Sequence, residues 1–223
     1  MIKIFIGYDR REELALKVLI DSITKHTTEL VSFCTIKNDL IPEYTRAYGQ
    51  QSVDFTYSRF LVPYLCDYKG WALFMDCDML VQKDISELWK LRDDKYALQV
   101  VKHDYKSKVS VKHDGEKQVH YPMKNWSSLM LFNCERCKAL TPDYVNTATG
   151  KQLHQFEWLN DAIGGLPIEW NWLADEYEYR KDVANIHYTL GGPWFGNKTD
   201  YDDEWLVHVN VIKTILHDHS CQS

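Results

Sequence analysis

The sequence contains no long apolar run, no block of like charges and no internal repeat. Its first residues, MIKIFIGYDRREE, hold an apolar stretch that is far too short for a signal peptide or a transmembrane segment. We therefore expect a cytoplasmic protein with reduced thiols. The formal net charge is −6 and the 26 Lys and Arg residues are scattered, which argues against a nucleic-acid partner.

Linkers and low-complexity segments are also lacking. With 223 residues and 45% hydrophobic residues, the chain can bury one core, so we expect a single domain over residues 1–223. Of the six cysteines, Cys134 and Cys137 form a lone C-x-x-C without a second pair at the spacing of a structural zinc site. Aromatic residues are abundant at 13%, and such residues fill cores and line pockets for bases and sugar rings.

The pattern of apolar residues predicts an α/β fold. A strand over residues 2–7, a helix beginning near Asp9 and a strand over 30–36 form a β-α-β unit, which is typical of a parallel sheet. We therefore expect a mostly parallel central sheet flanked by helices. Further strands are predicted over 71–75, 96–101, 127–132 and 186–189, helices over 54–67, 85–91, 152–163 and 202–217, and a hairpin at Gly115.

Two aspartates follow the apolar strand at 71–75. Asp76 and Asp78 are separated by Cys77, so alternate side chains of this turning segment can converge on one ion. Ligands of open α/β sheets bind outside the carboxyl ends of the strands. Two carboxylates there suit Mn²⁺ or Mg²⁺, which would stabilise a departing diphosphate. The alternative is that Asp76 caps a turn and Asp78 lies on the surface.

The residues around this D-x-D sequence carry a family resemblance. The segment from Tyr57 to Leu65, with Arg59 and Pro63 in place, precedes the strand, and Asp84 and a Leu-Trp pair follow it. This order resembles glycosyltransferase family 8, whose members are retaining, D-x-D, metal-dependent nucleotide-sugar transferases. The resemblance implies a GT-A fold, the Rossmann-like fold of nucleotide-diphospho-sugar transferases.

The resemblance also implies a donor site. The end of the first strand, Gly7-Tyr8-Asp9, resembles the start of the family's nucleotide site, where Tyr8 and Asp9 would contact uracil and ribose. Arg59 would lie near the diphosphate or the donor sugar, and Cys77 belongs to the D-x-D turn. The donor sugar would meet Ser127 and Ser128 at the start of a segment that resembles the family's Asn-(Ser/Ala)-Gly. Trp126 and Ser128 stand in place of the Asn and the Gly, so the identity of the donor sugar stays open.

A third metal ligand is implied near the carboxyl end of the chain. His187 begins a segment, His187 to Trp194, that resembles the family's H-x-x-G-x-x-K-P-W, although the loop is one residue shorter and lacks the Lys. By this resemblance His187 binds the metal. The role of the missing Lys toward the diphosphate would fall to Lys198 or to the backbone of Gly191 and Gly192. The alternative is a histidine of the core.

The family resemblance also implies a catalytic carboxylate. Residues 156–160, which include Glu157, resemble the family's D-Q-D-x-L-N only in the second acid, the Leu and the Asn. Glu157 would lie nearest the reacting carbon, and Asp161 is the neighbouring candidate. The alternative for Glu157 is a residue on the surface of a helix.

These features predict a glycosyltransferase that moves a sugar from a UDP-sugar to a glycan, a glycoprotein or a small hydroxyl acceptor. One alternative is a sugar-nucleotide-binding module without activity, and another is a sugar-nucleotide hydrolase. A nucleotidyltransferase is disfavoured, because the turn after Gly7 lacks the glycine-rich, basic phosphate loop that such enzymes carry.

Overall fold

The computed structural model describes residues 1–47, 52–104 and 122–220. Its main sheet has six strands in the order β2-β1-β3-β6-β5-β7. Strand β6 runs antiparallel to its neighbours β3 and β5, and the remaining pairs are parallel, so the predicted mostly parallel α/β sheet is confirmed. The strands are β1 (Ile2–Gly7), β2 (Val31–Ile36), β3 (Trp71–Met75), β5 (Leu98–Val101), β6 (Leu129–Asn133) and β7 (Gly164–Leu166).

The central strands form where the sequence is continuously apolar. Strands β3, β5 and β6 are almost wholly buried, as expected for strands that are covered on both faces. In the register of the sheet, Ile6 lies beside Met75, and Met75 lies beside Leu129. The ends of β1 and β3 and the start of β6 therefore share one edge, which we call the carboxyl edge.

A second, three-stranded sheet extends from this edge in the order β4-β9-β8. Strand β4 (Met79–Val81) directly follows the two aspartates, and it pairs antiparallel with β9 (Asn185–His187). Strand β8 (Trp172–Leu173) pairs with the other side of β9. Strands β4 and β8 were not predicted, because runs of three and two residues are too short to show a period.

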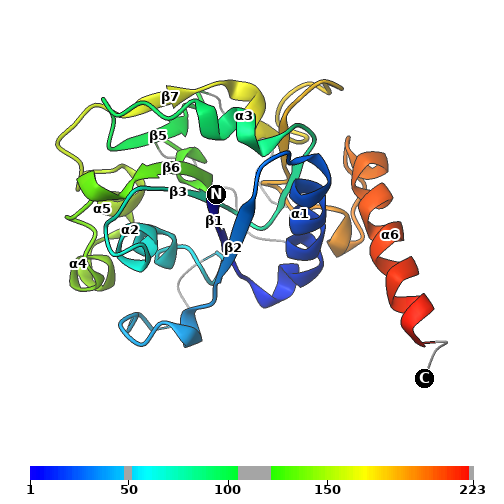
Figure 1. Ribbon diagram of the computed structural model, residues 1–223, viewed down its shortest axis with the longest axis horizontal. Coiled ribbons are helices and arrows are strands. Elements are labelled where there is room, and N and C mark those ends of the chain that lie inside the picture. The colour runs from blue at the N-terminus through cyan, green and yellow to red at the C-terminus, as the bar shows by residue number, and fades with distance from the viewer. Residues whose placement is uncertain (48–51, 105–121, 221–223) are drawn as a thin grey trace.

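Helices cover both sides of the main sheet (Figure 1). On the left of the figure lie α2 (Val62–Leu65), α4 (Pro142–Thr147) and α5 (Gly150–His154), and α3 (Ile85–Lys90) lies at the top. On the right, α1 (Glu13–His26) lies between the sheet and α6 (Asp202–Ser220). Among the described residues, no helix combines the length and the apolar character that crossing a bilayer requires.

Two predicted helices are wrong in extent. Over 54–67 the chain forms turns, a 3-10 helix (Ser58–Leu61) and the short α2, which ends before two left-handed residues, Asp67 and Tyr68. Over 152–163 only the first residues are helical, because α5 ends at His154 and Phe156 has a φ of 56°.

The two glycines that follow this segment, Gly164 and Gly165, belong to a strand. Gly164 lies in β7, where a Cβ atom would come within 2.6 Å of the Gln99 side chain. Only glycine therefore allows this close pairing with β5. The predicted hairpin at Gly115 lies outside the described residues.

Candidate active site

Asp76, Asp78 and His187 lie together at the carboxyl edge. One potential ligand atom from each comes within 4.8 Å of the others, and within the described ranges this is the one group of three or more such side chains that could hold a metal ion. The pairing of Met79 with His187 and a 2.9 Å hydrogen bond from the Tyr188 amide to the Asp78 carbonyl hold the two segments together.

The carboxylate of Asp78 has the properties of a metal ligand. Its Oδ1 is buried, has no hydrogen-bond partner and lies 3.4 Å from Nε2 of His187. A buried oxygen without a partner costs about 1–3 kcal/mol. Two carboxylates and an imidazole form a donor set that suits Mn²⁺ or Mg²⁺, and a bound cation would satisfy this oxygen.

Arg59 contacts the first aspartate rather than open solvent. Its Nη1 donates to Oδ1 of Asp76 over 2.7 Å and to the carbonyl of Ser127 over 2.9 Å, and the residue is 5% exposed. Burial raises the pKa of Asp76 to about 7, with Arg59 lowering it in part and Asp78 raising it further. Arg59 therefore orients Asp76 and offsets its charge.

Two residues that the sequence analysis missed support the loops of this edge. The side chain of Asn171 lies 2.9 Å from Nδ1 of His187, and Nδ1 of His154 lies 2.8 Å from Oγ of Ser127. Burial lowers the pKa of His154 to about 3, so this imidazole is neutral near pH 7. No motif marked either residue, because each acts through a contact with a distant segment.

Cys77 does not face the cluster as a ligand. It is fully buried, and its thiol donates to Oε2 of Glu12 over 3.2 Å. Burial and the nearby charge of Asp78 raise the pKa of Glu12 to about 8. The Cys77–Glu12 contact therefore attaches the D-x-D turn to the start of α1.

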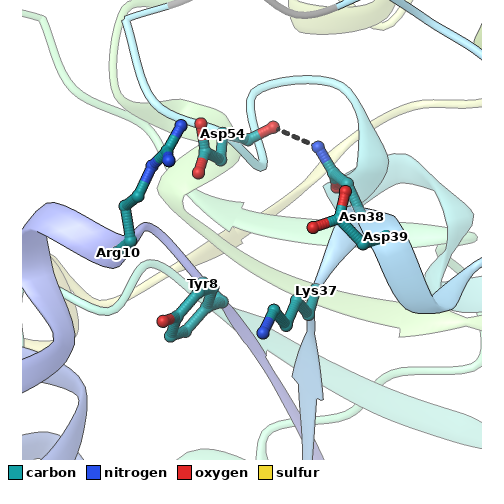
Figure 2. Close-up of a pocket in the computed structure, with 6 residues that line it drawn as sticks. All are labelled: Tyr8, Arg10, Lys37, Asn38, Asp39 and Asp54. Atoms are coloured by element: carbon teal, nitrogen blue, oxygen red, sulfur yellow. Dashed lines mark hydrogen bonds between the residues drawn. The ribbon is translucent and has the colours of Figure 1, made fainter.

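A pocket of about 390 Å³ opens beside the end of β1. Figure 2 shows its six lining residues around one opening, with the ring of Tyr8 next to Lys37, whose Nζ lies 5.4 Å from the ring centroid. The walls combine an aromatic ring, two cations, two carboxylates and an amide. The lining residues are Tyr8, Arg10, Lys37, Asn38, Asp39 and Asp54.

Asp9, which was expected beside Tyr8 in this site, is not among the lining residues. It is buried, and its carboxylate accepts hydrogen bonds from the backbone and side chain of Arg11 and from the amide of Asp54. Burial alone would raise its pKa, but the bonds and charge of Arg11 hold the pKa of Asp9 below its usual value. Asp9 thus caps the helical segment that leads into α1.

Close packing or a positive φ requires glycine at the three candidate glycine positions. A Cβ atom at Gly7 would lie 2.2 Å from the ring of Phe55, and one at Gly192 would lie 2.2 Å from the ring of Trp194. Gly191 has a φ of 94°, and its amide donates to the carbonyl of Tyr188. The Gly191 amide therefore already has a hydrogen-bond partner within the protein, whereas the side chain of Lys198 is exposed to solvent.

The two candidate catalytic carboxylates are exposed and form surface ion pairs. Glu157, just after α5, lies 3.1 Å from Nζ of Lys151. Asp161 lies 2.7 Å from Arg136, which follows the end of β6. Because β6 ends beside the start of β3, the structure places Asp161 at the edge opposite Asp76 and does not bring the two together.

Comparison with known sequences identifies the family. The model of glycosyl transferase family 8 matches residues 20–197. The chain is 47% identical over 218 residues to Protein CDI of Arabidopsis thaliana, a match that covers 92% of this chain and 84% of that protein. The chain belongs to glycosyl transferase family 8. It is therefore a glycosyltransferase.

Solved structures agree on the fold. The apo form of the bifunctional glycosyltransferase WbbM matches with a TM-score of 0.64 and 19% identity, over 93% of this chain but 49% of that one. An active-site mutant of LgtC matches with a TM-score of 0.60 and 13% identity, over 94% of this chain and 96% of that one. At these identities the likeness shows the GT-A fold alone.

Proposed function

We propose that this glycosyltransferase moves a sugar from a UDP-sugar to a hydroxyl group of a glycan, a glycoprotein or a small acceptor, with retention, and that it uses Mn²⁺ or Mg²⁺. The observation that carries the proposal is the convergence of Asp76, Asp78 and His187 within 4.8 Å. Such a site, when it holds a divalent cation, supplies positive charge that stabilises a diphosphate leaving group.

The relation between the pocket and the cluster supports a nucleoside diphosphate. Tyr8 follows β1 and Asp76 follows β3, and these strands are adjacent in the sheet. Adjacent strands lie about 4.8 Å apart, so one extended ligand can reach both sites. In this assignment the ring of Tyr8 and the polar walls of the pocket hold the base and ribose, and the three ligands hold the metal beside the phosphates.

The remaining residues act around this donor. Arg59 keeps Asp76 oriented, because it bonds both this carboxylate and the backbone of Ser127. Ser127 and Ser128 lie at the start of β6 on the same edge, where the family resemblance puts the donor sugar. Glu157 is our candidate for the carboxylate near the reacting carbon, and it rests on that resemblance.

The test is a calorimetric titration of UDP into metal-free protein, with and without Mn²⁺, and with ADP and GDP as controls. We expect tight binding of UDP only with Mn²⁺. UDP binding of equal affinity with and without Mn²⁺ would favour the sugar-nucleotide-binding module without activity. Donor cleavage that no acceptor accelerates would favour the hydrolase. The absence of any UDP binding would contradict the proposed donor.

A further inference from the structure

The side chain of Asn171 connects two of the segments that carry the candidate metal ligands. The residue ends a 3-10 helix (Ile168–Asn171) directly before β8, and it is fully buried. Its Oδ1 lies 2.9 Å from Nδ1 of His187, and its Nδ2 lies 2.8 Å from Oγ of Ser128. The carbonyl of Ser128 in turn accepts a 2.9 Å hydrogen bond from the amide of Asp76.

The hydrogen bonds determine which way the Asn171 amide faces. The Ser128 hydroxyl donates its one hydrogen to the carbonyl of Asn125 over 2.7 Å, so toward Asn171 its oxygen must accept. The carbonyl of Asn125 also lies 3.4 Å from Nδ2 of Asn171. Both neighbours require the amide nitrogen on this side, which directs Oδ1 toward His187.

This orientation sets the tautomer of the neutral imidazole. The carbonyl oxygen of Asn171 can only accept, so Nδ1 of His187 must carry the hydrogen. In a neutral imidazole the other nitrogen, Nε2, then has a free lone pair, and it faces the Asp78 carboxylate at 3.4 Å. Without Asn171, the opposite tautomer would gain a hydrogen bond from Nε2–H to Asp78 and so occupy both ligand atoms.

We infer that Asn171 is a positioning residue that keeps His187 in the Nδ1–H tautomer and leaves Nε2 and the Asp78 carboxylate available to a divalent cation. The part that concerns the cation rests on the proposed function. The tautomer itself is a property of the metal-free protein and is tested separately. Partners of this kind typically change metal affinity about 10–100-fold when they are removed.

The first experiment is long-range ¹H–¹⁵N NMR of histidine-labelled, metal-free protein near neutral pH, with the signal assigned by its loss in His187→Gln. We expect Nε2 to be the unprotonated nitrogen of His187. A proton on Nε2 in the wild-type protein would overturn the inference without any variant of Asn171.

Two substitutions then separate the acceptor from the shape of the side chain. Asn171→Leu removes the acceptor, and we expect the tautomer to reverse and Mn²⁺ affinity to fall at least about tenfold. Asn171→Asp also loses the donor to Ser128 but retains an acceptor for Nδ1–H. This variant should keep the wild-type tautomer, and its Mn²⁺ affinity should stay within a few-fold of that of the wild type. It still tests the inference if the Leu variant does not fold.

Several results would contradict the inference. One is a Leu variant with the wild-type tautomer and unchanged Mn²⁺ affinity, and another is equal losses of affinity in the Asp and Leu variants. The failure of the proposed function is distinguishable, because wild-type protein would then bind no Mn²⁺ while the NMR spectrum still showed the Nδ1–H tautomer.

Discussion

Carboxylates at the two edges of the main sheet differ in their exposure to solvent and in their neighbours. At the carboxyl edge, Asp76 and Asp78 are shielded from solvent and lie beside Arg59 and His187. At the opposite edge, Asp161 is 48% exposed and pairs with Arg136. Exposed pairs of this kind contribute about 0–1 kcal/mol, whereas burial of like charges shifts pKa values strongly. The environment that the fold creates, rather than the residue type, therefore decides which carboxylates have the burial and the neighbours of a candidate metal ligand.

Burial of carboxylates at the first edge also has a cost. Asp76 and Glu12 both have raised pKa values, and Asp78 leaves one oxygen without a hydrogen-bond partner. The hydrogen bonds that Arg59 donates to Asp76 and Cys77 donates to Glu12 favour the folded metal-free protein, but the raised pKa values and the oxygen without a partner oppose it. Buried carboxylates with raised pKa values and polar atoms without partners lower local stability. Such features are typical of functional sites, where a bound ligand compensates for them.

The strongest test of the comparison is Asp78→Ala. We expect the affinity for UDP in the presence of Mn²⁺ to fall more than about 100-fold. Removal of a residue that merely hydrogen-bonds a metal-binding side chain already lowers metal affinity about 10–100-fold, and Asp78 is a candidate metal ligand itself. Thermal stability without metal should not decrease, because the substitution removes a buried oxygen without a partner. Asp161→Ala should leave Mn²⁺ and UDP binding unchanged. Wild-type turnover by Asp78→Ala would refute the metal assignment.

The next test concerns Glu157, which is exposed although it is the proposed catalytic carboxylate. If it acts at the reacting carbon, Glu157→Gln should slow turnover about 100-fold or more. Its affinity for UDP should stay within about two-fold of wild type. Lys151→Met separates the carboxylate from its ion pair and should have little effect on turnover. Equal losses in turnover and donor affinity in Glu157→Gln would indicate a structural role.

The pH dependence of the free energy of unfolding tests the burial of carboxyl groups at the carboxyl edge. The pKa of Glu12 is about 8 in the folded protein against a usual value of 4.5. Between these pH values the folded state keeps a proton that the unfolded state has released, so stability should fall as pH rises from about 5 to 8, by up to about 1.4 kcal/mol per pH unit. Asp76 acts in the same direction, because its pKa is also raised.

Glu12→Gln isolates the first of these groups. The variant keeps the shape of the side chain and cannot ionise, so its unfolding free energy without metal should depend less on pH than that of the wild type. Urea unfolding at a series of pH values measures both slopes. Equal slopes in the two proteins would show that Glu12 does not keep its proton.

The smallest expected effect is steric. At Gly7 a Cβ atom would lie 2.2 Å from Phe55, so Gly7→Ala should destabilise the protein by about 1–3 kcal/mol. At Gly165, in the outer strand β7, a Cβ atom would meet nothing within 4 Å, so Gly165→Ala should be neutral or slightly stabilising. Equal losses in urea unfolding would show that the crowding at Gly7 is not what requires glycine.

The central strands and the segment that carries two of the candidate metal ligands could be predicted from the sequence. The strand at 71–75 and Asp76 and Asp78 after it form one local pattern, and short-range patterns are visible without a structure. The extent of the helix at 152–163 could not be predicted. Leu153 and Phe156 recur at helical spacing and both belong to the core, but Leu153 lies in α5 whereas Phe156 enters the core from a left-handed residue after the helix has ended.

By itself, the sequence determined the α/β class, the family and the segments that bear the candidate metal ligands, because each shows in short stretches of contiguous residues. Only the tertiary structure decided that Asn171 orients His187, that Asn38 and Asp54 lie together at the pocket beside Tyr8, and that Asp161 lies at the edge opposite Asp76. These relations join residues far apart in the chain. They follow from strand register and close packing, which no local pattern encodes.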